Sequence, residues 1–340
     1  MPYQPPYTAT PEIVNLVARI GEAAGARTAL EDRERRLRLR RIDRVRTIQG
    51  TLAIEGNTLS EAQITAILEG KPVIAPPREV QEVKNALAAY ERLPHWRPDR
   101  EADLLAAHRI LMSGLIEEAG TYRRGDVGVM AGKQVIHMAP PSGRVPHVMC
   151  DLFAWLTDTD AHPLIAGSVF HYEFEFIHPF ADGNGRLGRL WQSLILFHWH
   201  PWFAHMPIES LVHAHQAEYY QALQDSTDQT DSAPFIAFML RKILEALNAP
   251  QVTPQVTPQV GADLHRLLSV LNETMSREAL QNALGLRDRK SFREHYLKRA
   301  LRAGLIEMTL PDKPKSRAQR YRLTHQGQQW LAAQKDDMDE

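Results

Sequence analysis

Residues 178–189 read HPFADGNGRLGR and contain side chains that could bind a polyphosphate. The glycines and asparagine at 183–185 favour a turn, and a helical pattern begins directly after them. Such a turn offers unpaired backbone N–H groups at the positive end of a helix dipole, which attract anions. Arg186 and Arg189 are three residues apart and share one face of that helix. Two guanidinium groups beside these N–H groups indicate a site for phosphates.

The same segment supplies a metal ligand and a base. Asp182 could be an oxygen ligand for Mg²⁺, the ion that accompanies nucleotide phosphates. His178 begins the loop and could act as a general base near neutral pH. Each feature alone has an ordinary explanation, because Asn-Gly is common in turns and spaced arginines are commonly solvated. Their combination within twelve residues favours a site of phosphate chemistry.

A metal site is the alternative for the neighbouring histidines. His171, Glu175 and His178 follow an i, i+4, i+7 spacing and would share one helical face, which could suit zinc. His178, however, is followed at once by Pro-Phe and is better used as a base. We therefore interpret His171 as a buried, hydrogen-bonded residue that shapes the loop.

The sequence HPFADGNGRLGR resembles the Fic/Doc family signature HPFx[DE]GNGRxxR and matches it at every specified position. The resemblance extends to HYEFEFIHPF before the loop and to EYYQALQDSTDQTDSAPFIAF after it, and covers about residues 30–248. It implies a helical Fic core and a protein adenylyltransferase. The substrates would be ATP, bound with Mg²⁺, and a serine, threonine or tyrosine hydroxyl of a protein, including this chain itself.

The resemblance also implies roles for individual residues. His178 would take the proton from the target hydroxyl, which attacks the α-phosphorus while pyrophosphate leaves. Asp182 would hold Mg²⁺, the turn at 183–185 would form the anion hole, Arg186 would hold the β-phosphate side and Arg189 the γ-phosphate. The implied nucleotide-binding residues are Glu55, Gly183, Asn184, Gly185, Arg186, Leu187, Gly188, Arg189, Tyr219 and Tyr220. The two tyrosines look like the family's pair near the adenine, and ordinary helix packing is the equal alternative.

A second motif lies upstream, where TLAIEGN at 51–57 resembles the inhibitory pattern [ST]xxxE[GN] of Fic proteins. Thr51 and Glu55 have i, i+4 spacing and share one helical face. The resemblance implies that Glu55 pairs with Arg189 and takes the place that the γ-phosphate needs, so that ATP binds misaligned. The same glutamate could serve in AMP removal. The ordinary alternative is a glutamate before a glycine that ends a helix.

The elements that must position these residues are mostly helical. The segment 31–46 carries charges of both signs, which predicts a solvated helix face, with nucleic-acid contact as the less favoured alternative. That helix should end at Gly56-Asn57, and Ser60 with Gln63 forms a capping box for the next helix. Further helical patterns cover 78–93, 99–116, 146–158, 161–177, 185–199, 208–224 and 233–248.

The segment 121–141 departs from the helical pattern. Its Val, Ile and Met residues alternate around Ala131-Gly132, which predicts a β-hairpin. A lone hairpin is not stable by itself, so it must pack on the helical body or hold a partner strand. We expect the strand at 134–138 to pair with an extended segment of the target protein.

The composition changes after residue 249. The segment PQVTPQVTPQV at 250–260 repeats a proline-containing unit, which predicts an extended linker. Residues 261–330 hold 14 Lys and Arg against 7 Asp and Glu, so this part of the chain is basic. Helical patterns at 262–272, 276–284 and 288–303, then a hairpin pattern at 305–323, predict a winged helix-turn-helix. DNA is a candidate partner, with protein docking as the alternative. The basic residues of the second helix are Arg287, Arg289, Lys290, Arg293 and Lys298.

The composition of the whole chain is typical of a cytoplasmic protein. A net charge of -1 over 340 residues gives no global preference for nucleic acid or membrane. The single cysteine, Cys150, excludes an internal disulfide and fits a reducing compartment. The N-terminus lacks a signal-peptide pattern, and the most apolar stretch, 190–199, is too short to cross a bilayer.

These patterns together predict a mainly α fold, in which a Fic helical core carries a small β-hairpin flap and a winged helix-turn-helix follows. The expected parts are an N-terminal helical region with the inhibitory motif, the catalytic core, a linker, the winged domain and an acidic tail, at 1–95, 96–249, 250–260, 261–332 and 333–340. Two rival functions stay open. One is a Fic-fold enzyme that removes AMP or transfers phosphoryl, and the other is a DNA-binding regulator whose Fic core senses nucleotide. A homodimer also stays open, and no membrane partner is expected.

Overall fold

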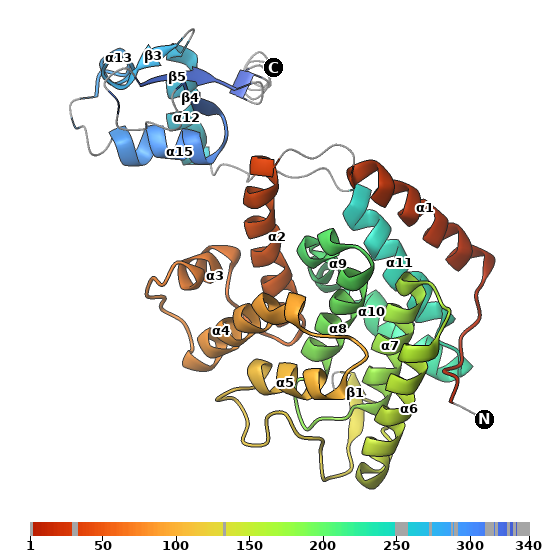
Figure 1. Ribbon diagram of the computed structural model, residues 1–340. Coiled ribbons are helices and arrows are strands. Elements are labelled where there is room, and N and C mark those ends of the chain that lie inside the picture. Colours follow the sequence, from red (N-terminus) through yellow and green to blue (C-terminus); the bar gives the residue numbers. More distant parts are fainter. Residues whose placement is uncertain are drawn as a thin grey trace. The chain divides into compact units, whose positions relative to one another are not determined.

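The computed structural model describes residues 3–28, 33–131, 134–248, 258–271, 274–286, 288, 292–309, 316, 319–324, 327–328 and 331. The chain divides into two compact units, Met1–Ala249 and Pro250–Glu340. Both units are built mainly from helices, and each contains a small number of short strands (Figure 1). The predicted mainly α fold is therefore confirmed.

The first unit is a helical body that carries a two-stranded hairpin. Its α-helices are α1 (Pro11–Thr28), α2 (Arg33–Ile54), α3 (Glu61–Leu68), α4 (Pro77–Arg92), α5 (Glu101–Leu111), α6 (Val145–Asp158), α7 (Pro163–Ile177), α8 (Asn184–Trp199), α9 (Ile208–Ala214), α10 (Gln216–Gln229) and α11 (Ala233–Asn248). Short 3-10 helices connect some of them: η1 (Leu93–His95), η2 (Ser142–Arg144) and η3 (Pro201–His205).

Helix α8 lies in the middle of this unit and packs against α7 (Figure 1). Its apolar residues point in several directions, and Leu187, Leu190 and Trp191 are fully buried, as expected for a helix surrounded by protein. Gly188 allows the close approach of α7, because a Cβ at this position would lie 2.9 Å from Cδ2 of His171. Helix α8 is thus held firmly along its length.

The N-terminal helices belong to the same unit. Helix α1 packs on α11, and α2 packs on α9. The contact between α2 and α9 is so close that a Cβ at Gly50 would lie 2.5 Å from the backbone nitrogen of Ser210. The predicted boundary near residue 95 therefore divides segments that pack together, because helical patterns in the sequence do not show which helices are partners.

The helix ends follow local signals in most places. Helix α2 ends before Gly56, whose φ is +91°, and Ser60 and Gln63 form the predicted capping box at the start of α3. The predicted helix 208–224 is wrong as one element, because it is interrupted at His215 between α9 and α10. The Nδ1 atom of His215 lies 3.0 Å from the carbonyl oxygen of Leu211, so the side chain competes with the backbone ladder there.

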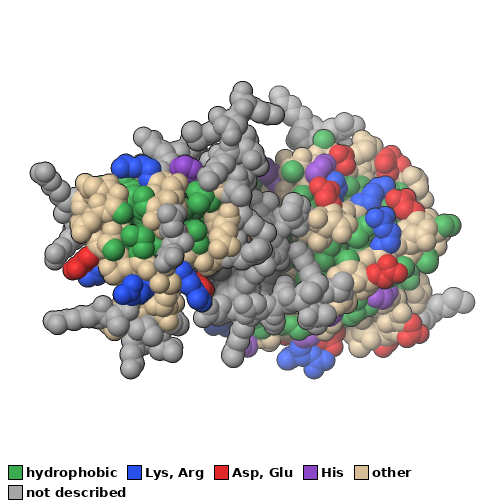
Figure 2. Space-filling model, turned by 90° about the horizontal axis from the view of Figure 1, so that it is seen from above, with side chains coloured by type: hydrophobic (Ala, Val, Ile, Leu, Met, Phe, Trp, Pro, Cys, Tyr) green, Lys and Arg blue, Asp and Glu red, His purple; other side chains and the backbone are tan. Residues whose placement is uncertain are grey.

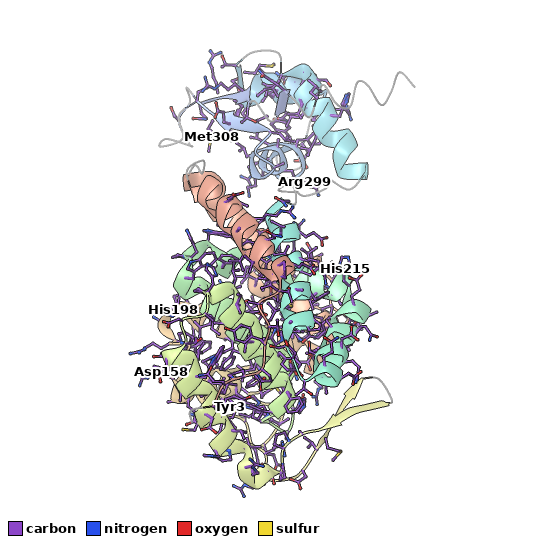
Figure 3. All side chains as sticks on the ribbon, turned by 90° about the vertical axis from the view of Figure 1, so that its right-hand side faces the viewer. Tyr3, Asp158, His198, His215, Arg299 and Met308 are labelled. Atoms are coloured by element: carbon purple, nitrogen blue, oxygen red, sulfur yellow. The ribbon has the colours of Figure 1, made fainter. Side chains whose placement is uncertain are left out.

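The predicted hairpin is present. Strand β1 (Gly128–Ala131) pairs antiparallel with β2 (Gln134–Met138), and the register shifts between Val129 and Met130. The hairpin projects from the helical body (Figure 3). Its predicted turn residue Gly132 lies outside the described residues.

The second unit combines short helices with a three-stranded antiparallel sheet of order β3-β5-β4. Its elements are α12 (Pro258–Val270), β3 (Met275–Ser276), α13 (Arg277–Ala283), the π-helical segment η4 (Phe292–Leu297), α15 (Lys298–Arg302), β4 (Ile306–Met308) and β5 (Arg320–Leu323). Leu267, Leu280 and Phe292 are fully buried and form a core separate from that of the first unit. Short helices are followed by the antiparallel pair β4 and β5, and β3 is the third strand of the sheet. This is the predicted winged helix-turn-helix arrangement.

The start of this unit differs from the prediction. Helix α12 begins at Pro258, so the predicted linker 250–260 overlaps the helix by its last three residues. Proline is well tolerated in the first helical turn, where its missing N–H has no intrahelical partner. The rest of that linker, the acidic tail 333–340 and the predicted DNA contacts Arg287, Arg289 and Lys290 lie outside the described residues. Contact with DNA stays a prediction.

The surface carries charges of both signs. Figure 2 shows acidic and basic side chains interspersed with apolar ones on the face that it presents, which agrees with a net charge of -1. Within the part of the chain that the structure describes, no helix has the length and apolar character to cross a membrane.

Candidate active site

The motif loop connects the end of α7 to the start of α8. His178 ends α7 in a left-handed conformation with φ 50° and ψ 60°, and its backbone N–H donates to the carbonyl of Phe174 over 2.9 Å. Positive φ is uncommon for a residue with a side chain and persists where the surroundings hold it. The imidazole is half-buried, and its Nδ1 atom has no hydrogen-bond partner among the described residues. The ring is therefore not tied to the protein through this nitrogen.

The side chain of Asn184 fixes the loop from inside. Its Oδ1 atom accepts from the N–H of Phe180 and its Nδ2 atom donates to the carbonyl of the same residue, each over 2.9 Å. These two hydrogen bonds satisfy the N–H and the carbonyl of Phe180, which in a turn lack the partners that a helix or strand would supply. Asn184 is buried, so it acts as a structural part of the loop.

A histidine that sequence reasoning missed supports the loop from α5. The ring of His108 stacks on Phe180 with centroids 3.7 Å apart. The N–H of Gly120 donates to Nδ1 of His108 over 2.8 Å, so the proton is on Nε2, which donates to the carbonyl of Asp182 over 2.9 Å. Burial lowers the pKa of His108 to about 4. The ring is therefore neutral near pH 7 and suited to hold the loop.

The N-terminus of α8 is open to an anion. Gly183, with φ +86°, is the N-cap residue and has no side chain to cap the first-turn N–H groups. These groups and the helix dipole favour negative charge at this point. Gly185 lets Glu55 and Arg189 approach these groups closely, because a Cβ there would collide with Oε1 of Glu55 and lie 3.0 Å from Nη1 of Arg189. The turn thus combines N–H groups that no side chain caps with the carboxylate of Glu55 close beside them.

Asp182 and Arg186 lie beside this N-terminus. Oδ1 of Asp182 accepts from the N–H of Gly183 over 2.6 Å and from Nη2 of Arg186 over 3.0 Å. The Asp182 side chain is 40% exposed, so its carboxylate can reach a ligand in solvent. The described residues contain no cluster of three or more His, Cys, Asp or Glu arranged for a metal. One exposed carboxylate fits Mg²⁺ that is held mostly by water and nucleotide phosphates.

Glu55, at the end of α2, contacts Arg189 of α8. Nη2 of Arg189 donates to Oε1 of Glu55 over 2.6 Å, and Nε donates to Oγ1 of Thr51 over 3.0 Å. Arg189 is buried, whereas the side chain of Glu55 is one-third exposed (33%). Burial opposes the charge on Arg189, but Glu55, Tyr219 and Glu175 together raise the pKa of the guanidinium. The structure thus brings together the two residues that the sequence paired.

A second contact connects the inhibitory segment to the loop. Nδ2 of Asn57 donates to Oε2 of Glu82 over 2.8 Å, and Oε1 of Glu82 lies 3.6 Å from Nη1 of Arg186. Arg78, one turn earlier on α4, lies 3.5 Å from both Glu82 and Asp182. Sequence reasoning missed Arg78 and Glu82, because nothing in the charged start of α4 shows that it faces the loop.

The histidine considered for zinc is engaged in the core. Nδ1 of His171 lies 2.7 Å from Oε1 of Gln192, and Nε2 lies 3.2 Å from the hydroxyl of Tyr219. Tyr219 is 1% exposed and packs among aromatic rings, which favours the packing interpretation for this residue. Tyr220 on the same helix is half-buried.

Comparison with known proteins agrees with this geometry. Residues 98–196 match the Fic/DOC family, and residues 262–324 match the C-terminal domain of the Filamentation induced by cAMP protein Fic-like. A crystal structure of a Fic family protein from Desulfovibrio desulfuricans G20 is 51% identical, with a TM-score of 0.70, over 95% of this chain and 99% of that one. A fragment of Fic-1 from C. elegans is 27% identical, with a TM-score of 0.56, over 69% of each chain.

Curated relatives carry an enzyme name. The protein adenylyltransferase Fic of Aedes aegypti is 29% identical over 57% of this chain, and the protein adenylyltransferase fic-1 of Caenorhabditis briggsae is 34% identical over 56%. The matched segments span 39% and 38% of the lengths of those relatives. The fold and the motif loop define a Fic-type protein. The chain belongs to the Fic/DOC family and carries a Fic-like C-terminal domain.

Proposed function

We propose that the protein is an adenylyltransferase that moves AMP from ATP to a hydroxyl group of a protein. One observation carries this proposal: a single short segment, from His178 to Arg189, holds all the groups that the reaction needs. They are a histidine whose Nδ1 atom has no hydrogen-bond partner among the described residues, a helix N-terminus without a side-chain cap, and two arginines. AMP transfer needs a base for the hydroxyl and positive charge around the triphosphate, and little covalent help from the protein.

The reaction follows from this arrangement. The imidazole of His178 accepts the proton of the target hydroxyl as its oxygen bonds to the α-phosphorus. The bond from that phosphorus to the bridging oxygen breaks, and pyrophosphate leaves. The N–H groups at 183–185 and the guanidiniums of Arg186 and Arg189 stabilise the negative charge on the phosphates. Asp182 would hold Mg²⁺, which supplies further charge stabilisation when bound with ATP.

Glu55 is proposed to restrain the enzyme, and its contact with Arg189 supports this. Arg189 is the residue proposed to bind the γ-phosphate, and Glu55 occupies its guanidinium at 2.6 Å. A carboxylate and a phosphate cannot share this position, because both carry negative charge. Arg189 also donates to Thr51, so it keeps its place when Glu55 leaves. ATP in the restrained protein binds without its γ-phosphate contact and with a poorly aligned α-phosphorus.

The target is proposed to dock on the hairpin. An extended segment added to β2 would gain backbone hydrogen bonds with little sequence selectivity. The protein itself can be such a target, and the proposed product carries AMP on serine, threonine or tyrosine.

Transfer from labelled ATP to proteins of a cell lysate tests this proposal. The expected result is labelled protein with Glu55→Gly and none with Glu55→Gly combined with His178→Ala, whose anion site stays intact. Equal labelling by both variants would show that the site does not perform the transfer.

A further inference from the structure

A buried arginine lies beneath the motif loop and outside the proposed phosphate site. The side chain of Arg123 is 1% exposed, and its nearest carboxylate, Asp126, is 3.9 Å away and 64% exposed. A buried charge without a buried counter-ion is costly unless hydrogen bonds satisfy it. The hydrogen bonds of this guanidinium must therefore offset the cost of burying its charge.

Its donors bind backbone carbonyls on two sides. Nε donates to the carbonyl oxygen of His178 over 2.8 Å, and Nη2 is 3.4 Å from that of Ile177. Nη1 donates to the carbonyl of Gly125 over 2.8 Å, and Nη2 donates to that of Pro140. One side chain thus connects the end of α7 to residues that flank the hairpin.

The backbone of Arg123 adds to this connection. Its N–H donates to the carbonyl of Pro179 over 2.9 Å. Gly125 comes before β1 and Pro140 follows β2, so the guanidinium joins the two roots of the hairpin to each other. Figure 3 shows the hairpin projecting from the helical body. The two roots lie at the base of the hairpin, where it joins that body.

His178 needs such support. Its left-handed backbone, with φ 50°, is unfavourable for a residue with a side chain. The bond to its carbonyl oxygen holds the peptide after this turn, and the peptide plane sets the direction in which the imidazole leaves the chain. Moving the imidazole by about 1 Å could reduce the transfer rate about 10²-fold.

We propose that Arg123 is a positioning residue for AMP transfer, which holds the base His178 and the target-docking hairpin in one fixed geometry. This inference rests on the proposed function. A target strand added to β2 would bring its hydroxyl to the imidazole because both are tied to the same guanidinium. Lysine cannot replace it, since a single ammonium group lacks the planar fork that reaches carbonyls on both sides.

The test compares Arg123→Lys with Arg124→Lys in the Glu55→Gly background. Arg124 is the matched control, because it is adjacent in sequence and 86% exposed. Arg123→Lys should lower kcat for AMP transfer about 10- to 100-fold and leave the Kd for ATP within about twofold, since the phosphate-binding groups remain. Arg124→Lys should change neither. In the His178→Ala background, Arg123→Lys should cause a smaller loss, because the part that acts through the imidazole is already gone and only the effect on the hairpin remains.

Three results would overturn the inference: an unchanged kcat, a parallel loss of ATP affinity, or an additive loss in the His178→Ala background. If the Glu55→Gly reference transfers no AMP, the proposed function fails, and hydrogen exchange then tests the positioning role alone. Exchange at the amide of Ala139, beside the hairpin root, should be at least about tenfold faster in Arg123→Lys than in the Arg124→Lys control.

Hydrogen exchange on the unsubstituted protein covers the case in which the variant does not fold. The amides of Arg123 and Ala139 donate to Pro179 and Val127, and the shared guanidinium should protect them together. Complete exchange at Ala139 while Arg123 stays protected would show that the hairpin root and the motif loop open separately, and would contradict the inference.

Discussion

Replacing Glu55 with glycine should raise activity and lower stability at the same time. The carboxylate of Glu55 accepts a 2.6 Å charge-assisted bond from Arg189, the guanidinium proposed to bind the γ-phosphate. Its removal frees that donor for ATP. Because Thr51 still accepts from Nε and Nη2 of Arg189, the guanidinium stays directed at the site.

The size of the gain follows from the bond that is freed. A hydrogen bond to a charged group contributes about 1.5–3 kcal/mol. Glu55 is one-third exposed, so solvent screening favours the lower end of that range. About 1.5 kcal/mol corresponds to roughly tenfold in ATP affinity, and correct alignment of the α-phosphorus should raise kcat further.

Stability should change in the opposite direction. Arg189 is buried, and removing one partner of a buried ion pair costs up to about 3–5 kcal/mol, less here because Glu55 is partly exposed. The Tm of Glu55→Gly should therefore be lower without ligand. Saturating ATP should raise this Tm more than that of the unsubstituted protein, because the γ-phosphate replaces the lost carboxylate.

The assay measures AMP transfer and Tm side by side for Glu55→Gly, Glu55→Gln and Glu61→Gln. Glu61 is the control, since its side chain is 52% exposed and its 3.7 Å pair with Arg46 involves no residue of the loop. Both Glu55 variants should gain transfer activity, and Arg189→Ala should cancel the gain. The reasoning is refuted if neither variant gains activity, or if the gain survives Arg189→Ala.

Three further predictions concern the base, the hairpin and the loop. His178→Ala should keep the Kd for ATP and lose about 10²–10⁴-fold in transfer rate; near-normal transfer at saturating ATP would exclude this base. Ile136→Pro removes a backbone donor from β2, so modification of a protein target should fall while ATP titration is unchanged; equal modification would contradict docking on the strand. His108 has an unfolded pKa of 6.5 and a folded pKa of about 4. Between these two pH values, only the unfolded chain binds a proton on this imidazole. Its contribution to stability is full above pH 6.5 and is lost as pH falls toward 4. Urea unfolding should show roughly 2–3 kcal/mol less stability at pH 4.5 than at pH 7 from this residue, and His108→Gln should lack that part of the pH dependence. An identical pH dependence in both proteins would refute it.

Local patterns predicted the parts of the fold that depend on nearby residues. The capping box at Ser60 and the turn at Gly56 are set within a few positions, and both are present. The hairpin was predicted from alternation within one short segment, and its strands pair as expected. The interruption at His215 was missed, because a histidine is compatible with a helix until its ring bonds to the turn before it.

Such local patterns could not predict contacts between residues that are distant in the sequence. His108 holds a residue 74 positions away, and Arg123 holds one 55 positions away. Nothing near either residue in the sequence shows these partners. Glu55 and Arg189, 134 positions apart, could be paired only because their motifs resemble those of a known family. The residues that bear the proposed chemistry were thus recognisable, whereas those that position them required the structure.

The central claim is that the group transferred is AMP, taken from the α-phosphate of ATP. The most direct test incubates the Glu55→Gly protein with ATP labelled on the α-phosphate and, separately, with ATP labelled on the γ-phosphate. We predict that label from the α-phosphate appears on protein and that label from the γ-phosphate does not, because pyrophosphate leaves. Label from the γ-phosphate on protein, with none from the α-phosphate, would show phosphoryl transfer and contradict the account.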